Sequence, residues 1–175
     1  MTTTFGYLAA KGLADVLSAS IADLAGKVSP VTEPPTAESG YPAAAVLLES
    51  MAPRTAQDAE VYDDDGNTEI IDDGRAFVEA GHLQGRGRLW VAARNPAQRE
   101  RLQTAIVRRF LDEELAPGRL TVTVANAEVD GFPTPGSWPV AFFLADTEWR
   151  EELVFSERRW AFLGFTVDIP LLLLR

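Results

Sequence analysis

The amino-acid sequence predicts an α+β fold, with a mixed, largely antiparallel sheet and two amphipathic helices packed on one face of it. Two segments place apolar side chains at helical spacing, and several others alternate apolar and polar residues as half-buried strands do. The order along the chain is helix, several strands, helix, then three strands. A chain of 175 residues without internal repeats is expected to form a single domain over residues 1–175.

The first predicted helix spans about residues 8–26, and Gly26 is expected to end it. Residues 28–42 contain four prolines and Gly40, so an irregular, Pro-rich connector within the domain is expected there. The apolar stripe of the helix consists of Leu13, Val16, Leu17, Ile21 and Leu24.

Strands are predicted after this connector. The apolar run of residues 44–49 follows a proline and is typical of a buried strand. Residues 60–62 and 68–71 flank Asp65-Gly66-Asn67, which is a hairpin signal. This part of the chain is therefore expected to contain a β-hairpin.

Alternation predicts further strands in the second half of the chain. Residues 83–93 alternate so that one face is partly polar, and residues 120–124 alternate apolar residues with threonines. Residues 140–149 and 160–174 are also strand-rich and are joined by a charged segment, 150–159. Together these segments supply the strands of the predicted sheet.

The second predicted helix has the strongest local signals. Asn95 is a good N-cap, Pro96 fits the first helical position, and Gln98 stands three residues after the cap. Pro117-Gly118 is expected to end the helix. Its apolar stripe consists of Leu102, Ala105, Ile106, Phe110 and Leu115.

The composition excludes several classes of function. A formal net charge of -10 and a pI near 4.6 argue against general binding to a nucleic-acid backbone. The absence of cysteine excludes disulfides, Cys-ligated zinc, iron–sulfur clusters and a thiol nucleophile. No secretory signal or membrane-spanning run is recognised, so a soluble, intracellular protein without a membrane partner is expected.

The negative charge is concentrated in one segment. Residues 1–85 have a net charge of -10, whereas residues 86–175 are neutral overall. Residues 58–79, which we call the acidic segment, contain nine carboxylates and a single basic residue, Arg75. Their local net charge is therefore -8. Such charges repel one another, so an exposed acidic hairpin or loop is predicted over about residues 54–85. A solvated loop that only keeps the protein soluble is the alternative.

Motifs for catalysis or metal binding are weak. The glycine-rich residues 81–87 lack the spacing and the following helix of a phosphate loop, and the lone His82 cannot form a two-histidine metal site. Asp63-Asp64-Asp65-Gly66 resembles part of a calcium loop, but Val61 would occupy the first ligand position. No catalytic residue, cofactor or specific metal site is therefore predicted, although weak calcium binding stays open.

An acid-dependent hydrolase is an alternative of another class. It would need two carboxylates at a defined separation in a cleft, with tryptophans lining a sugar site. Core packing or an interface is the simpler interpretation of the tryptophans. They are Trp90, Trp138, Trp149 and Trp160.

Arginines cluster around one predicted strand and the second helix. We interpret them as a surface for an acidic partner, such as the acidic segment of a neighbouring identical subunit in head-to-tail association. A nucleic-acid surface and ordinary solvated faces are the alternatives. The cluster contains Arg86, Arg88, Arg94, Arg99, Arg101, Arg108 and Arg109, of which Arg86, Arg88, Arg108 and Arg109 are predicted at the subunit interface.

The order of predicted elements over about residues 40–175 resembles the tail-terminator and neck proteins of tailed bacteriophages. The most similar part is residues 89–101, where a strand leads directly into a helix whose first turn contains Asn95-Pro96-Ala97-Gln98-Arg99. The closing segment Val167-Asp168-Ile169-Pro170-Leu171-Leu172 is also similar.

This resemblance implies a structural virion protein without enzymatic activity or a cofactor, assembled in the host cytoplasm. It implies a homo-oligomeric ring, expected to be a hexamer, that ends the tail tube and joins it to the head connector. DNA would pass through the lumen without specific binding. A negative lumen would suit this passage, because it would not hold phosphate.

The acidic carboxylates are therefore expected at the lumen or the tube-facing rim. The apolar C-terminal run is expected at an interface or in a buried edge strand. Alternatives are another neck, head-completion or baseplate-adjacent protein, the hydrolase, and a calcium-responsive adaptor. The residues concerned are Asp63, Asp64, Asp65, Asp72 and Asp73 for the lumen, and Leu171, Leu172 and Leu173 for the interface.

Overall fold

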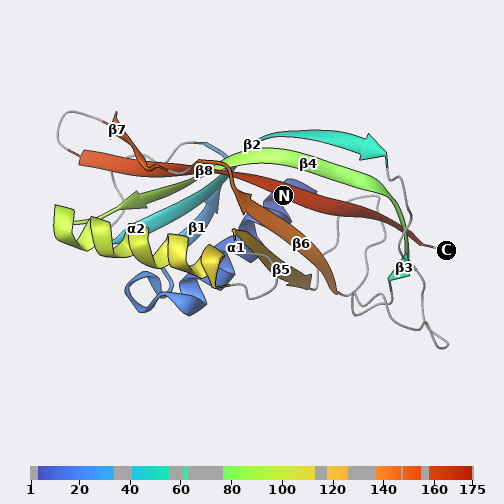
Figure 1. Cartoon of the computed structure of the whole chain (residues 1–175), viewed down its shortest axis with the longest axis horizontal. Coiled ribbons are helices and arrows are strands. Elements are labelled where there is room, and N and C mark those ends of the chain that lie inside the picture. Colours follow the sequence, from blue (N-terminus) through green and yellow to red (C-terminus); the bar gives the residue numbers. More distant parts are fainter. Residues whose placement is uncertain are drawn as a thin grey trace.

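A computed structural model gives the fold and describes residues 4–33, 41–55, 61–62, 77–112, 118–125, 137–146, 148–154 and 158–174. Two α-helices and one short 3-10 helix accompany eight strands (Figure 1). The helices are α1 (Phe5–Ser20), η1 (Ala22–Leu24) and α2 (Pro96–Leu111). The strands are β1 (Val28–Val31), β2 (Ala43–Thr55), β3 (Val61–Tyr62), β4 (Phe77–Ala92), β5 (Arg119–Ala125), β6 (Ser137–Leu144), β7 (Arg150–Val154) and β8 (Arg158–Leu174).

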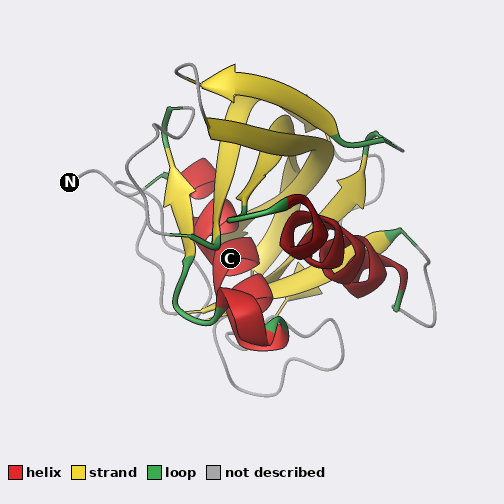
Figure 2. Ribbon diagram, turned by 90° about the vertical axis from the view of Figure 1, so that its left-hand side faces the viewer, coloured by secondary structure: helices red, strands yellow, loops and turns green. Residues whose placement is uncertain are grey.

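The strands form one mixed sheet in the order β1-β2-β4-β8-β6-β5, with β3 paired to β4 and β7 paired to β8. Only β1 and β2 run parallel, and every other described pair is antiparallel. Figure 2 shows that the sheet is curved rather than flat. The predicted α+β class with a largely antiparallel sheet is therefore confirmed.

Each face of the sheet contributes to a separate apolar cluster. The larger cluster joins Leu13 and Leu17 of α1 and Ile106 of α2 to sheet residues such as Leu89 and Val91, and we call this sheet surface the core face. The opposite surface, the outer face, holds a smaller cluster. Among the described residues, both helices contribute buried side chains to the larger cluster and none to the smaller one. The smaller cluster consists of Ala43, Ala45, Leu47, Trp90, Ala92 and Trp160.

Helix α1 is displaced toward the N-terminus from the predicted range of 8–26. It begins at Phe5, because the side chain of Thr4 accepts a hydrogen bond from the Tyr7 N–H at 3.2 Å and so caps the first turn. It ends at Ser20, because Ile21 has extended backbone angles. Ile21 and Leu24 still reach the core, so the apolar stripe was predicted correctly although the helix ends before them.

The prediction of an irregular connector over 28–42 is wrong for residues 28–31. They form β1, which pairs with β2 from Val28 opposite Ala44 to Val31 opposite Leu47. Pro30 is compatible with this strand because β1 lies at the sheet edge, where a missing N–H need not break a second ladder. Residues 34–40 of the predicted connector lie outside the described residues.

The predicted acidic loop over about 54–85 is too long at both ends. Residues 54–55 belong to β2, and residues 77–85 belong to β4, which pairs with both β2 and β8. Strand β3 pairs with residues 77–78, and the predicted turn at Asp65-Gly66-Asn67 lies outside the described residues. The glycine-rich residues 81–87 lie within β4, in agreement with the predicted strand over residues 83–93.

Two of these glycines occupy a crowded part of the sheet. A Cβ atom at Gly87 would overlap the carbonyl oxygen of Leu47 and lie 2.5 Å from Cζ of Phe165. A Cβ atom at Gly85 would lie 2.7 Å from the carbonyl oxygen of Ser50. Glycine is therefore required here by the close approach of β2 and β8, not by an unusual φ angle.

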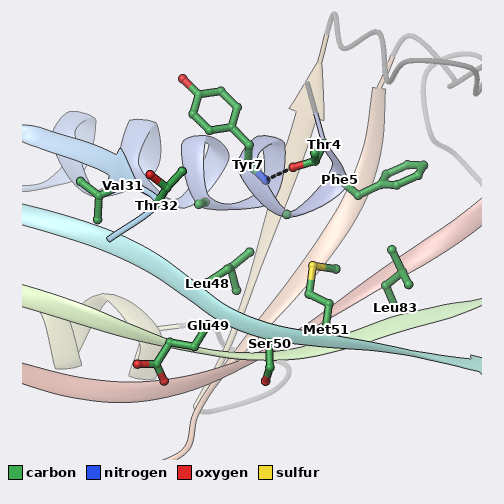
Figure 3. Close-up of a pocket in the computed structure, with 12 residues that line it drawn as sticks. Thr4, Phe5, Tyr7, Val31, Thr32, Leu48, Glu49, Ser50, Met51 and Leu83 are labelled. Carbon is green, nitrogen blue, oxygen red and sulfur yellow. Dashed lines mark hydrogen bonds between the residues drawn. The ribbon is translucent and has the colours of Figure 1, made fainter. Parts of the chain in front are cut away.

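A bulge in β2 lies opposite these glycines. The register with β4 shifts between Leu48 and Ser50, so Leu48 and Met51 both face α1 although they are three residues apart (Figure 3). Glu49 and Ser50 point to the other side (Figure 3). The bulge therefore changes which residues of β2 reach the outer face.

Helix α2 begins at Pro96, with Asn95 as its N-cap, as the sequence predicts. The Asn95 side chain accepts a hydrogen bond from the Gln98 N–H at 2.8 Å, and the Gln98 side chain accepts one from the Arg94 N–H at 2.9 Å. The helix ends at Leu111, earlier than Pro117-Gly118 predicted. Gly118, with φ of 84°, instead donates its N–H to the Phe110 carbonyl at 3.1 Å.

The C-terminal part forms more sheet than predicted. The charged segment contains β7, which pairs with the start of β8 from Arg150 opposite Phe162. At the other end of β8, Leu172 lies opposite Glu79 and Leu173 opposite Val78. The apolar run at the C-terminus is thus the end of a long paired strand, and its side chains lie outside the described residues.

Candidate functional site

The outer face of the sheet aligns four polar side chains and one aromatic side chain from five strands. The strand registers place one residue from each of β2, β4, β8, β6 and β5 in a single cross-strand row. Side chains in such rows are neighbours because adjacent strands lie about 4.8 Å apart. The row, which we call the Arg86 row, contains Ser50, Arg86, Thr166, Phe143 and Arg119.

A hollow of about 550 Å³ is lined by four residues of this row, all except Arg119. Gly85 contributes no side chain to it, and Phe143, whose exposed fraction of 36% is large for an aromatic residue, forms part of its wall. The guanidinium group of Arg119 lies 5.8 Å from the centre of the Phe143 ring. Arg86 is exposed and forms no ion pair within the described part of the chain. The hollow therefore presents an available cation beside an exposed aromatic ring.

The next cross-strand row contains an acid that is already paired. Asp168 lies opposite Gln84, and its Oδ1 is 2.7 Å from Nδ1 of His82. Both side chains are about one-third exposed, at 28% and 31%. Among the described residues that line the hollow, Asp168 is the one carboxylate. Because His82 contacts it, the donors on Arg86, Gln84 and the two hydroxyl groups dominate the chemistry of the hollow.

Arg88, predicted at a subunit interface, is engaged within the chain. Its Nε is 2.9 Å from Oε1 of Glu49, and its guanidinium carbon lies 4.7 Å from the Phe162 ring centre and 5.9 Å from that of Trp90. These contacts join the β2 bulge to β8 across β4. The geometry therefore favours an internal role for Arg88, in contrast to Arg86.

The structure does not bring the four predicted interface arginines together. Arg108 and Arg109 lie in the last turn of α2, whose Ile106 and Phe110 pack against the core face. Arg86 projects from the outer face. Besides Arg88, the outer face also carries Arg54, in register with His82, and Arg119, in register with Phe143.

Sequence reasoning missed Arg54, Arg119 and the contact between His82 and Asp168. The period-two alternation of β5 would have placed Arg119 on the same side as its threonines, and that signal was present. The contact between His82 and Asp168 joins residues 86 positions apart, so it depends on the register of β4 and β8. No local pattern marks it.

A second, apolar pocket of about 410 Å³ lies between the start of α1 and the β2 bulge (Figure 3). Its apolar lining includes Phe5, Leu48, Met51 and Leu83. Glu49 lines its margin but points away from α1 (Figure 3). The pocket can accept an apolar side chain but offers little to bind a charged group.

The alternatives of hydrolase and calcium adaptor receive no geometric support from the described residues. The described residues that line each hollow include a single carboxylate. It is Glu49 in the pocket beside α1 and Asp168 in the hollow beside Arg86. A glycosidase would need two. The described residues contain no group of three or more His, Asp or Glu side chains that could hold a metal ion.

The tryptophans do not form an exposed aromatic site in the described structure. Trp90 and Trp160 are buried, with exposed fractions of 0% and 1%, and Trp149 packs partly buried against the larger cluster. The side chain of Trp138 lies outside the described residues. Core packing, the simpler interpretation, holds for Trp90 and Trp160.

Other predicted site residues lie beyond what the structure describes. This holds for the side chains of Leu171, Leu172 and Leu173, and for all atoms of the five predicted lumen carboxylates. No described helix is long and apolar enough to cross a membrane. The five carboxylates are Asp63, Asp64, Asp65, Asp72 and Asp73.

Comparison with protein-family models and with curated proteins finds no match to this chain.

Proposed function

We propose that the protein is a structural subunit of a phage virion, one of several identical copies in a ring that ends the tail tube and joins it to the head connector. The ring is expected to be a hexamer, with DNA passing through an acidic lumen. In this role the chain binds itself, the tail tube protein and the connector, and it needs neither an active site nor a cofactor.

The observation that supports this proposal is the separation of opposite charges on one chain. Arg54, Arg86 and Arg119 lie on the outer face of the sheet, whereas the acidic segment has a net charge of -8. Two different, complementary surfaces on identical chains favour head-to-tail contacts, which close into a ring when the rotation permits. A ring is the arrangement that a tube-ending subunit requires.

The shape of the sheet agrees with this proposal. Strands β2, β4 and β8 continue past the helices, with β3 and the C-terminus at the far end (Figure 1). We call this extension the arm, residues 52–55, 77–82 and 170–174. Tyr62 and Phe77, the two residues that flank residues 63–76, pair with each other there. The acidic segment thus leaves and re-enters the sheet on the arm, away from the helices.

The test is the mass of the purified protein in solution, by light scattering at several concentrations and two salt levels. A closed ring near six times 19.1 kDa supports the proposal, as does a monomer that forms a ring only when tail tube protein is added. A protein that is monomeric at every concentration and does not bind purified tail tube would overturn the proposed function.

A further inference from the structure

We infer that the hollow around Arg86 receives carboxylates from the acidic segment of a second copy of this chain. This inference deepens the proposed function and rests on it for the idea that copies associate. It specifies the contact: the outer face of one subunit and residues 58–79 of the next.

The first argument is the chemistry of the hollow. A guanidinium group offers paired N–H donors that match a carboxylate, and Arg86 has no competing acid among the described residues. Ser50 and Thr166 add hydroxyl groups on either side of Arg86 in the same row. The carboxylate nearest in register, Asp168, contacts His82. The hollow therefore has donors for an incoming carboxylate.

The second argument is charge complementarity. The arginines of the outer face that lack an ion pair among the described residues are Arg54, Arg86 and Arg119. Register and strand spacing place Arg86 and Arg119 three strands apart, about 14 Å. A chain of acidic residues can bridge such a distance, whereas a single carboxylate cannot. The acidic segment of this protein has that composition.

The third argument is that the carboxylates closest to Tyr62 and Phe77 cannot reach Arg86 of their own chain. Tyr62 and Phe77 are paired neighbours, and Arg86 lies nine residues along β4 from Phe77, about 30 Å. Asp65 is three residues beyond Tyr62, so a fully extended chain carries it no more than about 11 Å. Asp73, four residues before Phe77, reaches about 14 Å. Asp63, Asp64, Asp65 and Asp73 of the same chain therefore cannot reach Arg86, so a contact between these carboxylates and Arg86 joins two molecules.

The experiment uses three full-length variants. The outer-face variant has Arg86→Glu and Arg119→Glu, and the segment variant has Asp63→Lys, Asp64→Lys and Asp65→Lys. Arg101→Glu is the matched control, because Arg101 is also exposed but lies on α2. Circular dichroism checks that each variant keeps the wild-type fold, and Arg86→Ala replaces the outer-face variant if that variant does not fold.

Self-association of each variant alone is expected to weaken at least tenfold, whereas the control matches the wild type. An equal mixture of the outer-face and segment variants is expected to recover assembly. In that mixture the wild-type acidic segment of the outer-face variant can bind the wild-type outer face of the segment variant. The lysines of the segment variant can in turn bind the glutamates of the outer-face variant. Raising the salt from about 50 mM to about 500 mM is expected to weaken the wild-type contact, because exposed ion pairs are screened.

The outcomes separate this inference from the proposed function. Assembly of the outer-face variant with wild-type affinity overturns the inference while leaving the ring intact. If the wild type is monomeric, a synthetic peptide of residues 58–79 is titrated onto the full-length protein. Peptide binding that the outer-face variant loses at least tenfold supports the inference without a ring, and no peptide binding overturns it. Binding of a duplex DNA oligonucleotide in place of the peptide also overturns it.

Discussion

Replacing Gly87 with alanine adds a single methyl group at a crowded position of β4, and we expect it to destabilise the fold substantially. The new Cβ atom would overlap the carbonyl oxygen of Leu47 and lie 2.5 Å and 2.9 Å from two ring atoms of Phe165. The carbonyl belongs to β2, which pairs with β4 at this point. The Phe165 ring packs edge-on against Phe142, with centroids 5.6 Å apart. Neither neighbour can move without disturbing the sheet or the core.

The expected loss of stability follows from two opposing effects. Overpacking of a core typically costs about 1–3 kcal/mol, and two rigid neighbours place Gly87 at the upper end of that range. Alanine offsets about 0.5–1 kcal/mol of this by restricting the unfolded chain. The net loss should be about 2 kcal/mol, which corresponds to a fall in Tm of about 4–8 °C for a domain of this size.

Urea denaturation at constant m-value measures this loss. Gly6→Ala is the control, because the nearest atom to its Cβ would be Met51 Sδ at 3.0 Å, the end of a flexible side chain. We expect it to leave stability unchanged or raise it slightly. Phe165→Leu in the Gly87→Ala background should recover part of the loss, as a double-mutant cycle would detect. A Gly87→Ala protein within about 0.5 kcal/mol of wild type would refute the steric argument.

Three further predictions concern stability measured by the same denaturation. Asn95→Ala should lower the unfolding free energy by about 1 kcal/mol because it removes the cap of α2, whereas Asn95→Ser should stay close to wild type; equal losses would argue against a capping role. Ile106→Ala should cost about 2–5 kcal/mol because Ile106 is fully buried in the larger cluster, and a loss below 1 kcal/mol would contradict that packing. Arg88→Ala should cost about 1 kcal/mol through its contacts with Glu49 and Phe162, while Arg86→Ala should change stability by less than about 0.5 kcal/mol. The reverse order would mean that Arg86, not Arg88, is the structural arginine.

Arg86 and Arg88 therefore separate two roles that sequence reasoning had combined. Both alternate onto the outer face of β4, and both were predicted at a subunit interface. Arg88 forms an ion pair with Glu49 and lies against the Phe162 ring. Arg86 lines a hollow and forms no ion pair among the described residues. The alternation of side chains along β4 is enough to predict that both arginines point to the same face of the sheet. It could not distinguish them, because the difference depends on which residues of β2 and β8 lie opposite each arginine.

The candidate site was predictable only in part. Sequence reasoning selected Arg86 and the acidic segment, and the structure adds Ser50, Thr166 and Phe143 to the surroundings of Arg86. These residues come from three strands that are distant along the chain. The β2 bulge also matters, because it turns Glu49 and Ser50 together to the outer face (Figure 3). No composition or spacing signal marked that bulge.

The sequence by itself determined the α+β class, the cap and apolar stripe of α2, and the alternation of β5. These features depend on side chains within about four residues of one another, where helix and strand periodicity and capping operate. The tertiary structure alone decided that residues 28–31 pair as an edge strand, that Gly85 and Gly87 have no room for a Cβ atom, and that His82 contacts Asp168. Those outcomes depend on the register of the whole sheet, which forms when distant apolar residues share one core.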